Sequence, residues 1–295
     1  MKPSPFDYHR PDSIEEAAEL LADLPEAELM AGNQSLSIVM ANRLASPEHI
    51  VDLNGVDDLE YIDSTADSVE LGALARHRDI EASPALTENY RVLSEAAGQI
   101  AGPTVRNRGT IGGSIGEADP AGNYPCVLVA MGGELELASA DGRRTVDAED
   151  YFVAYMLTDI EEEELIASVR FPREPFPVSR TGMAFLGQKR AAQTWPTLSV
   201  ASAVRVDDPD AEDPTIEEAR LGFANAADVP LRIEDVEAEV EGEPLTEAAL
   251  DAAGDVAYDG VSPQPEQHAD EVYKRELADE YTKRAIRTAY DRATT

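Results

Sequence analysis

Ala31-Gly32-Asn33-Gln34-Ser35-Leu36 and Arg106-Asn107-Arg108-Gly109-Thr110-Ile111-Gly112-Gly113-Ser114 are the two stretches that decide the fold of this chain. Glycine and asparagine readily take φ > 0 and let main-chain N–H groups converge on an anion. The second stretch adds two hydroxyls and two arginines. The apolar run 36–44 predicts a short helix directly after the first turn, and the positive end of a helix favours negative charge. We therefore interpret each stretch as a backbone cradle for phosphate, and the pair as suited to a diphosphate-bridged ligand.

Each turn by itself also has a purely structural interpretation, because most glycine-rich turns only reverse the chain. Neither turn matches the dinucleotide fingerprint G-x-G-x-x-G or the P-loop G-x-x-x-x-G-K-[ST]. The sequence therefore gives no direct support to a Rossmann or P-loop fold.

Local patterns predict several elements around the two turns. Ser13 and Glu16 form a capping box that opens a helix over 14–24. Other helices are expected over 87–100, 124–131 and 273–290. Strands are expected over 28–31, 49–53, 69–74, 134–137, 144–147, 165–171, 183–186, 197–206 and 219–223. The segment 171–177 contains Pro172, Pro175 and Pro177 and is predicted to be a linker, since proline disfavours helices and lacks an amide donor for a sheet.

The two turns in this order resemble the flavin-binding segments of a known family, the FAD-carrying medium subunit of molybdenum hydroxylases such as aerobic carbon monoxide dehydrogenase and xanthine dehydrogenase. The first turn is followed by Asn42-Arg43-Leu44-Ala45-Ser46-Pro47 and Val51-Asp52-Leu53, and the second by Ala118-Asp119-Pro120-Ala121. Residues 185–195 and 268–286 fit the family more loosely. The resemblance therefore extends over nearly the whole chain.

The resemblance implies an α+β protein with a PCMH-type FAD-binding fold. The FAD-binding domain is expected over 1–174, with two α/β subdomains over about 1–56 and 57–174. A C-terminal domain of the carbon monoxide dehydrogenase flavoprotein type is expected over 178–295. Strand patterns followed by helical ones predict that this domain is α+β, with helices against a three-stranded antiparallel sheet.

The resemblance also implies a set of cofactor-binding residues and no catalytic or metal-binding ones. The first turn would wrap the pyrophosphate, and the second would contact the same ligand from the other side. Asp119 and Asn123 would lie near the ribityl or ribose hydroxyls, Ile166 against the flavin ring, and Lys189 where the family commonly offers a lysine. The full set is Met30, Ala31, Gly32, Asn33, Gln34, Ser35, Leu36, Ser37, Thr110, Ile111, Gly112, Gly113, Ser114, Asp119, Asn123, Ile166 and Lys189.

Three positions depart from the family pattern. Asn33 stands where many members have glycine, Asn123 where they usually have aspartate, and Gly187 where lysine is common, so Lys189 takes that role only with a shift of register. Because the cradles need bare backbone, we expect that Gly32→Val and Gly113→Val each abolish FAD retention and leave the fold intact.

The family's chemistry implies that this chain is an oxidoreductase subunit that binds FAD noncovalently. Substrate would be oxidised at a molybdopterin centre on a large subunit. Electrons would cross [2Fe-2S] clusters on a small subunit, and FAD would pass them to an external acceptor, in a dimer of heterotrimers. Two alternatives stay open at this point: a stand-alone FAD-dependent oxidoreductase of the same fold, and a non-catalytic nucleotide-binding module.

Composition indicates where the protein works. Asp and Glu number 59 against 24 Lys and Arg, a formal net charge of −35, and the lysines are only Lys2, Lys189, Lys274 and Lys283. Repulsion on this scale is screened within about 3 Å at 1 M salt. With 43% hydrophobic residues interleaved among the acids, the chain is expected to fold rather than stay disordered. We predict a halophilic, cytoplasmic protein with no membrane span, and such an acidic surface makes nucleic acid an unsuitable partner.

Single residues add little chemistry of their own. Cys126 is the only cysteine, which excludes an internal disulfide and a self-contained iron–sulfur cluster, and the histidines lack metal-ligand spacing. Trp195 has two interpretations, stacking near a flavin or packing in a core. The basic residues of the helix 273–290 are either a partner-facing surface or a solvated face.

Overall fold

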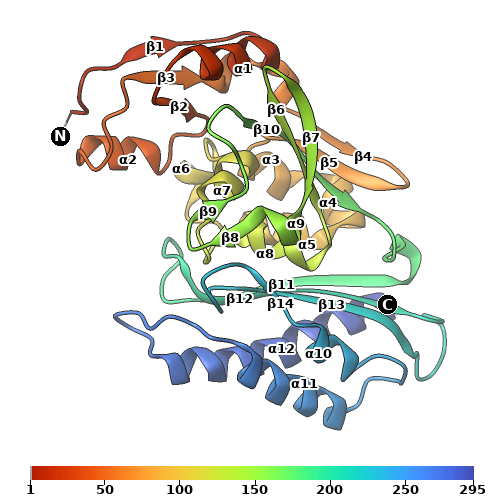
Figure 1. The fold of residues 1–295 in the computed structure, drawn as a ribbon. Coiled ribbons are helices and arrows are strands. Elements are labelled where there is room, and N and C mark those ends of the chain that lie inside the picture. Colours follow the sequence, from red (N-terminus) through yellow and green to blue (C-terminus); the bar gives the residue numbers. More distant parts are fainter. Residues whose placement is uncertain (1) are drawn as a thin grey trace.

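The N-terminal part of the chain is a small parallel sheet with one helix packed on it. The computed structural model describes residues 2–295 (Figure 1). The strand order is β1-β3-β2, and β3 pairs in parallel with both neighbours. The elements are β1 (Asp7–His9), α1 (Ile14–Asp23), β2 (Ala27–Met30), α2 (Leu36–Ala41) and β3 (His49–Asp52). As predicted, Ser13 caps α1 by accepting a hydrogen bond from the Glu16 amide, and the apolar face of α1 is buried.

A five-stranded antiparallel sheet forms the middle of the molecule, in the order β4-β5-β10-β6-β7. Its strands are β4 (Ile62–Ser64), β5 (Ser68–Gly72), β6 (Glu134–Ser139), β7 (Gly142–Asp147) and β10 (Leu165–Pro172). The central strand β10 is buried along most of its length. Two short 3-10 turns, η1 (Leu53–Gly55) and η2 (Asp57–Leu59), connect this sheet to the first one.

Short helices pack beside this sheet and carry the second glycine turn. They are α3 (His77–Ala82), α4 (Pro84–Asn89), α5 (Arg91–Gly98), α6 (Pro103–Arg106), α7 (Ile111–Glu117), α8 (Asn123–Ala130) and α9 (Ala148–Tyr151). A hairpin of β8 (Phe152–Ala154) and β9 (Leu157–Thr158) follows α9. The prediction of one helix over 87–100 was wrong, because α4 and α5 are separated at Tyr90. This residue leaves helical geometry (φ −152°, ψ 53°), and its buried ring packs on Phe171 at 5.8 Å between centroids.

The C-terminal part is an antiparallel sheet in the order β11-β12-β13-β14. Its elements are β11 (Thr181–Lys189), β12 (Pro196–Val206), β13 (Ile216–Ala224), β14 (Leu231–Arg232), α10 (Glu234–Ala238), α11 (Glu247–Gly260) and α12 (Glu271–Ala293). The sheet lies between the helices α11 and α12 and the central helices α5 and α8 (Figure 1). The α+β class is as predicted, but the sheet gains a fourth strand, since the two-residue β14 is too short to show a periodic pattern.

Glycines allow close packing on both faces of this sheet. A Cβ on Gly182 would lie 1.9 Å from the Ala289 carbonyl oxygen of α12, and one on Gly222 would lie 2.5 Å from the Cys126 carbonyl oxygen of α8. Any larger side chain at either position would force a helix away from the sheet. The central helices and the C-terminal sheet are therefore in direct backbone contact.

The proline-rich segment 171–177 is anchored rather than free. Arg173 is buried and reaches three oxygens of the central part: the Thr65 carbonyl at 2.6 Å, the Ser64 hydroxyl at 2.8 Å and the Asn89 carbonyl at 3.0 Å. A short 3-10 turn, η3 (Val178–Arg180), then leads into β11.

The basic residues of α12 are used inside the molecule. Lys283 lies 2.8 Å from Asp279, Arg284 lies 2.6 Å from Glu280, and Arg287 reaches Glu247 of α11 at 2.6 Å. These contacts favour the solvated-face interpretation over a free cationic patch. Over residues 2–295, no helix combines the length and the apolar character that crossing a membrane requires.

Candidate functional site

The fold brings the two glycine turns into direct contact. A Cβ on Gly32 would lie 2.4 Å from the carbonyl oxygen of Arg108 and 2.7 Å from the Cα of Gly109. The backbones therefore touch at a distance that only glycine permits. Our expectation that Gly32→Val leaves the fold intact is wrong, because the valine would push the two turns apart.

The first turn offers a run of unused backbone donors. In the part of the chain that the structure describes, none of the amides of residues 32–37 donates to a protein acceptor. Asn33 takes the left-handed conformation (φ 56°), as its residue type predicted. Two carbonyls of the turn are already occupied, since the Gln34 side chain donates to the Gly32 carbonyl at 2.7 Å and the Ser37 hydroxyl to the Asn33 carbonyl at 2.9 Å. Successive free amides of this kind form an anion-binding concavity.

The second turn is built differently and is not a backbone cradle. It is the capped start of α7, and its first amides all have partners within the protein. Thr110 is the N-cap, and its hydroxyl accepts from the Gly113 amide at 3.1 Å. The remaining donors are Ile111 to the Ala75 carbonyl, Gly112 to the Ala73 carbonyl and Ser114 to the Thr110 carbonyl. The amides of residues 111–114 are therefore occupied, which differs from our interpretation of the second turn as bare amides around phosphate.

The glycines of α7 serve two different purposes. A Cβ on Gly112 would lie 2.6 Å from the Cβ of Ala73, so this glycine lets α7 pack on the chain that follows β5. Gly113 is exposed, and a Cβ there would meet the Thr110 hydroxyl at 2.9 Å and the Ala31 Cβ at 4.0 Å. Gly113 therefore lines the space between α7 and the first turn.

Asn54 and Arg76, which the sequence analysis did not identify, link the two turns by hydrogen bonds. The Asn54 side chain donates to the Ala31 carbonyl of the first turn at 2.8 Å. Arg76 donates to Asn54 Oδ1 and to the Arg108 carbonyl of the second turn, both at 2.6 Å. Asp52 fixes Asn54 by accepting from its amide at 3.0 Å. Asn54 directly follows the segment 51–53 that carries part of the resemblance, but only the three-dimensional structure shows that it reaches Arg76.

His77 supports the second turn from inside the protein. Its amide donates to the Gly109 carbonyl at 3.0 Å, and a Cβ on Gly109 would lie 2.5 Å from His77 Nε2. The ring packs against Tyr124 at 5.3 Å between centroids. Burial lowers the pKa of His77 to about 3, and the charges of Arg76 and Arg106 act in the same direction. The imidazole is therefore neutral at neutral pH.

Glu117, at the end of α7, places a carboxyl group beside the first turn. The pKa of this carboxyl group is raised overall, mainly by burial and also by the charge of Asp119, and a hydrogen bond with Ser35 acts in the opposite direction. No sequence pattern distinguishes this residue, because a single Glu at a helix end is common on surfaces.

The remaining predicted residues lie at different places around α7. Asp119 is in the turn after α7, and its carboxylate accepts from the Ala121 amide at 2.8 Å. Ile166, on β10, lies 3.6 Å from the position of a Cβ on Gly116 of α7. Asn123 is buried and donates to the Ala96 carbonyl of α5 at 2.8 Å, so this side chain is used in packing.

Lys189 lies at the end of β11, next to the connection between α5 and α6. Its ammonium donates to the carbonyls of Gln99 at 2.6 Å and Ala192 at 2.7 Å, and burial followed by the charge of Arg106 lowers its pKa. A cavity of about 390 Å³ opens here, lined by Gly98, Gln99, Ala101, Gly102, Pro103, Arg106, Lys189, Ala192 and Gln193.

Trp195 lies in the loop that follows β11. Its side chain is 55% exposed, which rules out the interpretation as a core residue.

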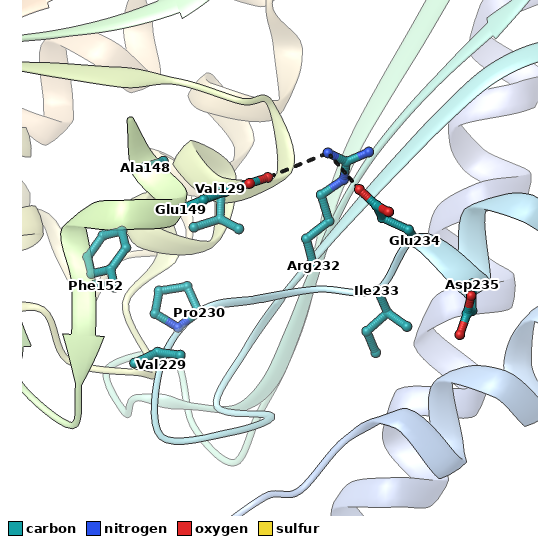
Figure 2. A pocket seen from close by; sticks show the side chains of 10 residues that line it. All are labelled: Val129, Ala148, Glu149, Phe152, Val229, Pro230, Arg232, Ile233, Glu234 and Asp235. Carbon is teal, nitrogen blue, oxygen red and sulfur yellow. Dashed lines mark ion pairs between the residues drawn. The ribbon is translucent and has the colours of Figure 1, made fainter. Parts of the chain in front are cut away.

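A larger cavity, of about 510 Å³, lies elsewhere, between α8 and α9 on one side and β14 and α10 on the other (Figure 2). Arg232 stands between Glu149 at 3.7 Å and Glu234 at 3.9 Å, and Glu237 holds it at 2.7 Å. None of the predicted site residues lines this cavity. Its only cation is already paired with carboxylates, so it does not suit an anionic ligand. Among residues 2–295 there is also no cluster of three or more His, Cys, Asp or Glu that could hold a metal ion.

The comparisons with known proteins agree over the whole chain. The family described as "FAD binding domain in molybdopterin dehydrogenase" matches residues 4–174, and "CO dehydrogenase flavoprotein C-terminal domain" matches residues 184–289. The carbon monoxide dehydrogenase medium chain of Hydrogenophaga pseudoflava is 34% identical over 99% of both chains. The nicotine 6-hydroxylase medium subunit of Paenarthrobacter nicotinovorans is 32% identical over 97% of this chain and 98% of that one.

A solved structure supports the same assignment. The carbon monoxide dehydrogenase from Hydrogenophaga pseudoflava that lacks the Mo-pyranopterin moiety of its molybdenum cofactor superimposes with a TM-score of 0.92 at 35% identity, over 99% of each chain. The similarity of sequence and of fold therefore extends over nearly the whole chain. This chain belongs to the family of FAD-binding medium subunits of molybdopterin-dependent dehydrogenases.

Proposed function

We propose that this chain is the FAD-binding electron-transfer subunit of a molybdenum-containing hydroxylase or dehydrogenase. The observation that carries the proposal is the run of six amides, residues 32–37, that have no protein acceptor. This run follows Ala31, whose Cβ lies 4.0 Å from the position of a Cβ on the exposed Gly113 of α7. A diphosphate supplies the acceptors that these amides lack, and charge-assisted hydrogen bonds to backbone amides are among the stronger ones in proteins. The residues present therefore fit FAD.

The predicted site residues divide into groups with different tasks. The amides of residues 32–37 would hold the diphosphate. Asp119 would bind sugar hydroxyls, Ile166 would pack against the flavin ring, and Lys189 would place a positive charge near it. Asn123 would contribute indirectly, through its hydrogen bond to α5. FAD, when bound, accepts two electrons and passes them on singly or in pairs.

The protein's own contribution is to keep the donors fixed before the ligand arrives. The bridge through Asn54 and Arg76 ties the carbonyls of Ala31 and Arg108 together. The neutral imidazole of His77 fills the space under Gly109. Fixed amides need no reorganisation on binding, which lowers the free-energy cost of ordering the site.

We further propose that the subunit works with a large molybdopterin subunit and a small [2Fe-2S] subunit, in a dimer of heterotrimers. The relatives are named as medium chains or medium subunits, which supports partners of both kinds. The β8–β9 hairpin gives a surface for one of them, because it exposes Val153, Tyr155, Met156 and Leu157, each by 47% or more. Clustered apolar residues on so acidic a chain are a mark of a protein–protein contact.

The acidic composition supports a halophilic protein that works in the cytoplasm. A formal net charge of −35 repels itself at low ionic strength, and molar salt screens that repulsion. We expect the melting temperature to rise steeply between 0.1 M and 2 M KCl. A melting temperature that does not change over this range would contradict the halophilic assignment.

The central experiment is to produce the chain in high salt and record its visible spectrum. We expect a yellow flavin that is released on denaturation, since nothing in the proposed contacts is covalent. A chain that retains no flavin after reconstitution with FAD would contradict the proposal. Co-purification with molybdenum and iron–sulfur proteins would distinguish a subunit from a stand-alone flavoprotein.

A further inference from the structure

We propose that Asn225, supported by Glu266 and Lys274, is a positioning residue of the FAD site. It belongs to the C-terminal half of the chain but holds the turn that joins α7 to α8. The inference rests on the proposed function, because Asp119 in that turn is expected to bind the sugar hydroxyls of FAD.

The contact with the turn is a backbone hydrogen bond. The Asn225 amide donates to the Pro120 carbonyl at 2.7 Å. Asn225 directly follows β13 and takes the left-handed conformation (φ 60°), which asparagine tolerates better than most residues. This conformation ends the strand, and the Asn225 amide donates to Pro120, outside the sheet.

The side chain of Asn225 fixes that conformation. Its Nδ2 donates to the carbonyls of Pro196 at 3.1 Å and Thr197 at 3.2 Å, at the start of β12. It also donates to Glu266 Oε1 at 2.5 Å. The side chain therefore ties the end of β13 to the neighbouring strand and to the segment before α12.

Lys274 holds Glu266 in place. Its side chain is fully buried in the first turns of α12, and its ammonium lies 2.6 Å from Glu266 Oε1. A buried ammonium is unfavourable unless it is paired, so the contact with Glu266 has to form whenever α12 packs on the sheet. The same carboxylate oxygen accepts from both Lys274 and Asn225, so the packing of α12 sets the position of Asn225.

The turn itself is braced but needs an external anchor. Ala118 takes the left-handed conformation (φ 49°), and the Gly122 amide donates to the Asp119 carbonyl at 2.8 Å. These local bonds fix the shape of the turn. The bond from Asn225 to Pro120 fixes its location relative to the C-terminal sheet, next to the expected flavin contacts. Loss of this anchor is expected to shift Asp119 and leave the fold in place.

The experiment compares Glu266→Gln and Lys274→Met in the full-length chain with the matched control Lys283→Met. This control removes a lysine of the same helix that pairs with Asp279 and with Asp251 of α11 and has no contact with Glu266 or Asn225. The readouts are the Kd for FAD from quenching of flavin fluorescence, the visible circular dichroism of bound FAD, and the melting temperature of the apoprotein. We expect both network variants to raise the Kd about tenfold, equal to about 1.4 kcal/mol, and to change the visible dichroism. The control should change neither.

The inference would be overturned if Glu266→Gln and Lys274→Met kept the wild-type Kd and dichroism and lowered only the melting temperature. The contacts among Asn225, Glu266 and Lys274 would then be merely structural. Asn225→Gly is a second variant in case Lys274→Met does not fold. Glycine accepts positive φ and keeps the amide but removes the side-chain anchors, so the Kd should again rise, and an unchanged Kd would count against the inference. Failure of the proposed function has a different signature, since wild-type protein would then bind no FAD.

Discussion

Gly113→Val is the most direct test of the site, because it separates the fold from the ligand. Gly113 is exposed on α7, and a Cβ there meets the Thr110 hydroxyl at 2.9 Å and, across the gap, the Ala31 Cβ at 4.0 Å. Replacing a helical glycine by alanine removes a backbone penalty of about 0.5–1 kcal/mol, and the β-branched valine recovers only part of it. The contact with Thr110 opposes this gain, since that hydroxyl is the helix cap and a cap contributes about 1 kcal/mol. The apoprotein should therefore keep its stability to within about 1 kcal/mol.

Binding of FAD should respond very differently. The valine methyl groups would occupy the space between α7 and Ala31, the residue that precedes the free amides of residues 32–37. A hydrogen bond to a charged group contributes about 1.5–3 kcal/mol. Loss of two such bonds to the diphosphate would cost about 3–6 kcal/mol, or about two to four powers of ten in Kd.

The assay is a fluorescence titration with FAD, together with thermal unfolding of the apoprotein in the same buffer. Gly113→Ala should give a smaller loss of affinity. Gly260→Ala is the control, a glycine at the end of α11 where the new Cβ would meet only the Ile233 side chain, at 3.0 Å. Wild-type affinity in a folded Gly113→Val variant would show that the diphosphate does not lie between these turns.

Three further outcomes are expected. Arg76→Met removes the bridge to Asn54 and the Arg108 carbonyl and should raise the Kd for FAD about tenfold or more. The control is Arg78→Met, because Arg78 pairs only with the exposed Asp79, and this variant should keep the Kd of the wild type. Equal effects of the two substitutions would refute the role of the bridge. Burial lowers the pKa of His77 to about 3 in the folded protein, against an ordinary value of 6.5, so between these pH values only the unfolded chain binds the proton. The free energy of unfolding should therefore fall with decreasing pH in this range, by up to about 1.4 kcal/mol per pH unit. Urea melts of His77→Gln should lose this part of the pH dependence, and an unchanged dependence would mean that His77 is not neutral. Tyr155→Glu on the exposed β8–β9 hairpin should leave the flavin content unchanged and abolish co-purification of partner subunits. The control Val178→Glu, at another exposed apolar residue, should leave both unchanged. Retention of the partners by Tyr155→Glu would show that the hairpin is not part of the interface.

Much of the fold could be predicted because its signals are local. Ser13 caps α1, the strand patterns over 134–137 and 144–147 mark β6 and β7, and the pattern over 197–206 marks the long β12. The three-residue β1 gave no signal, since a strand so short has no periodicity and its pairing with β3 is remote in sequence. The break at Tyr90 depends on burial of its ring against Phe171, which is a tertiary effect.

The candidate site was predictable in its location and less so in its chemistry. Both turns could be identified from residue types, but the two have different backbone environments. The amides of α7 are satisfied by Ala73 and Ala75, which lie far away in sequence, so no local pattern reveals that they are occupied. Asn54 and Arg76 were missed for the same reason, because each makes its contact with a residue more than twenty positions away.

The anchoring of Arg173 limits how this polypeptide can be dissected. The proline-rich segment 171–177 resembles a domain boundary, but Arg173 donates hydrogen bonds to three oxygens of the central part. Trypsin needs an extended, accessible arginine, so the native protein should resist cleavage after Arg173 even though prolines surround it. Fragments separated at this point would each expose a surface that the intact protein covers, and neither half should be expected to behave as an independent building block.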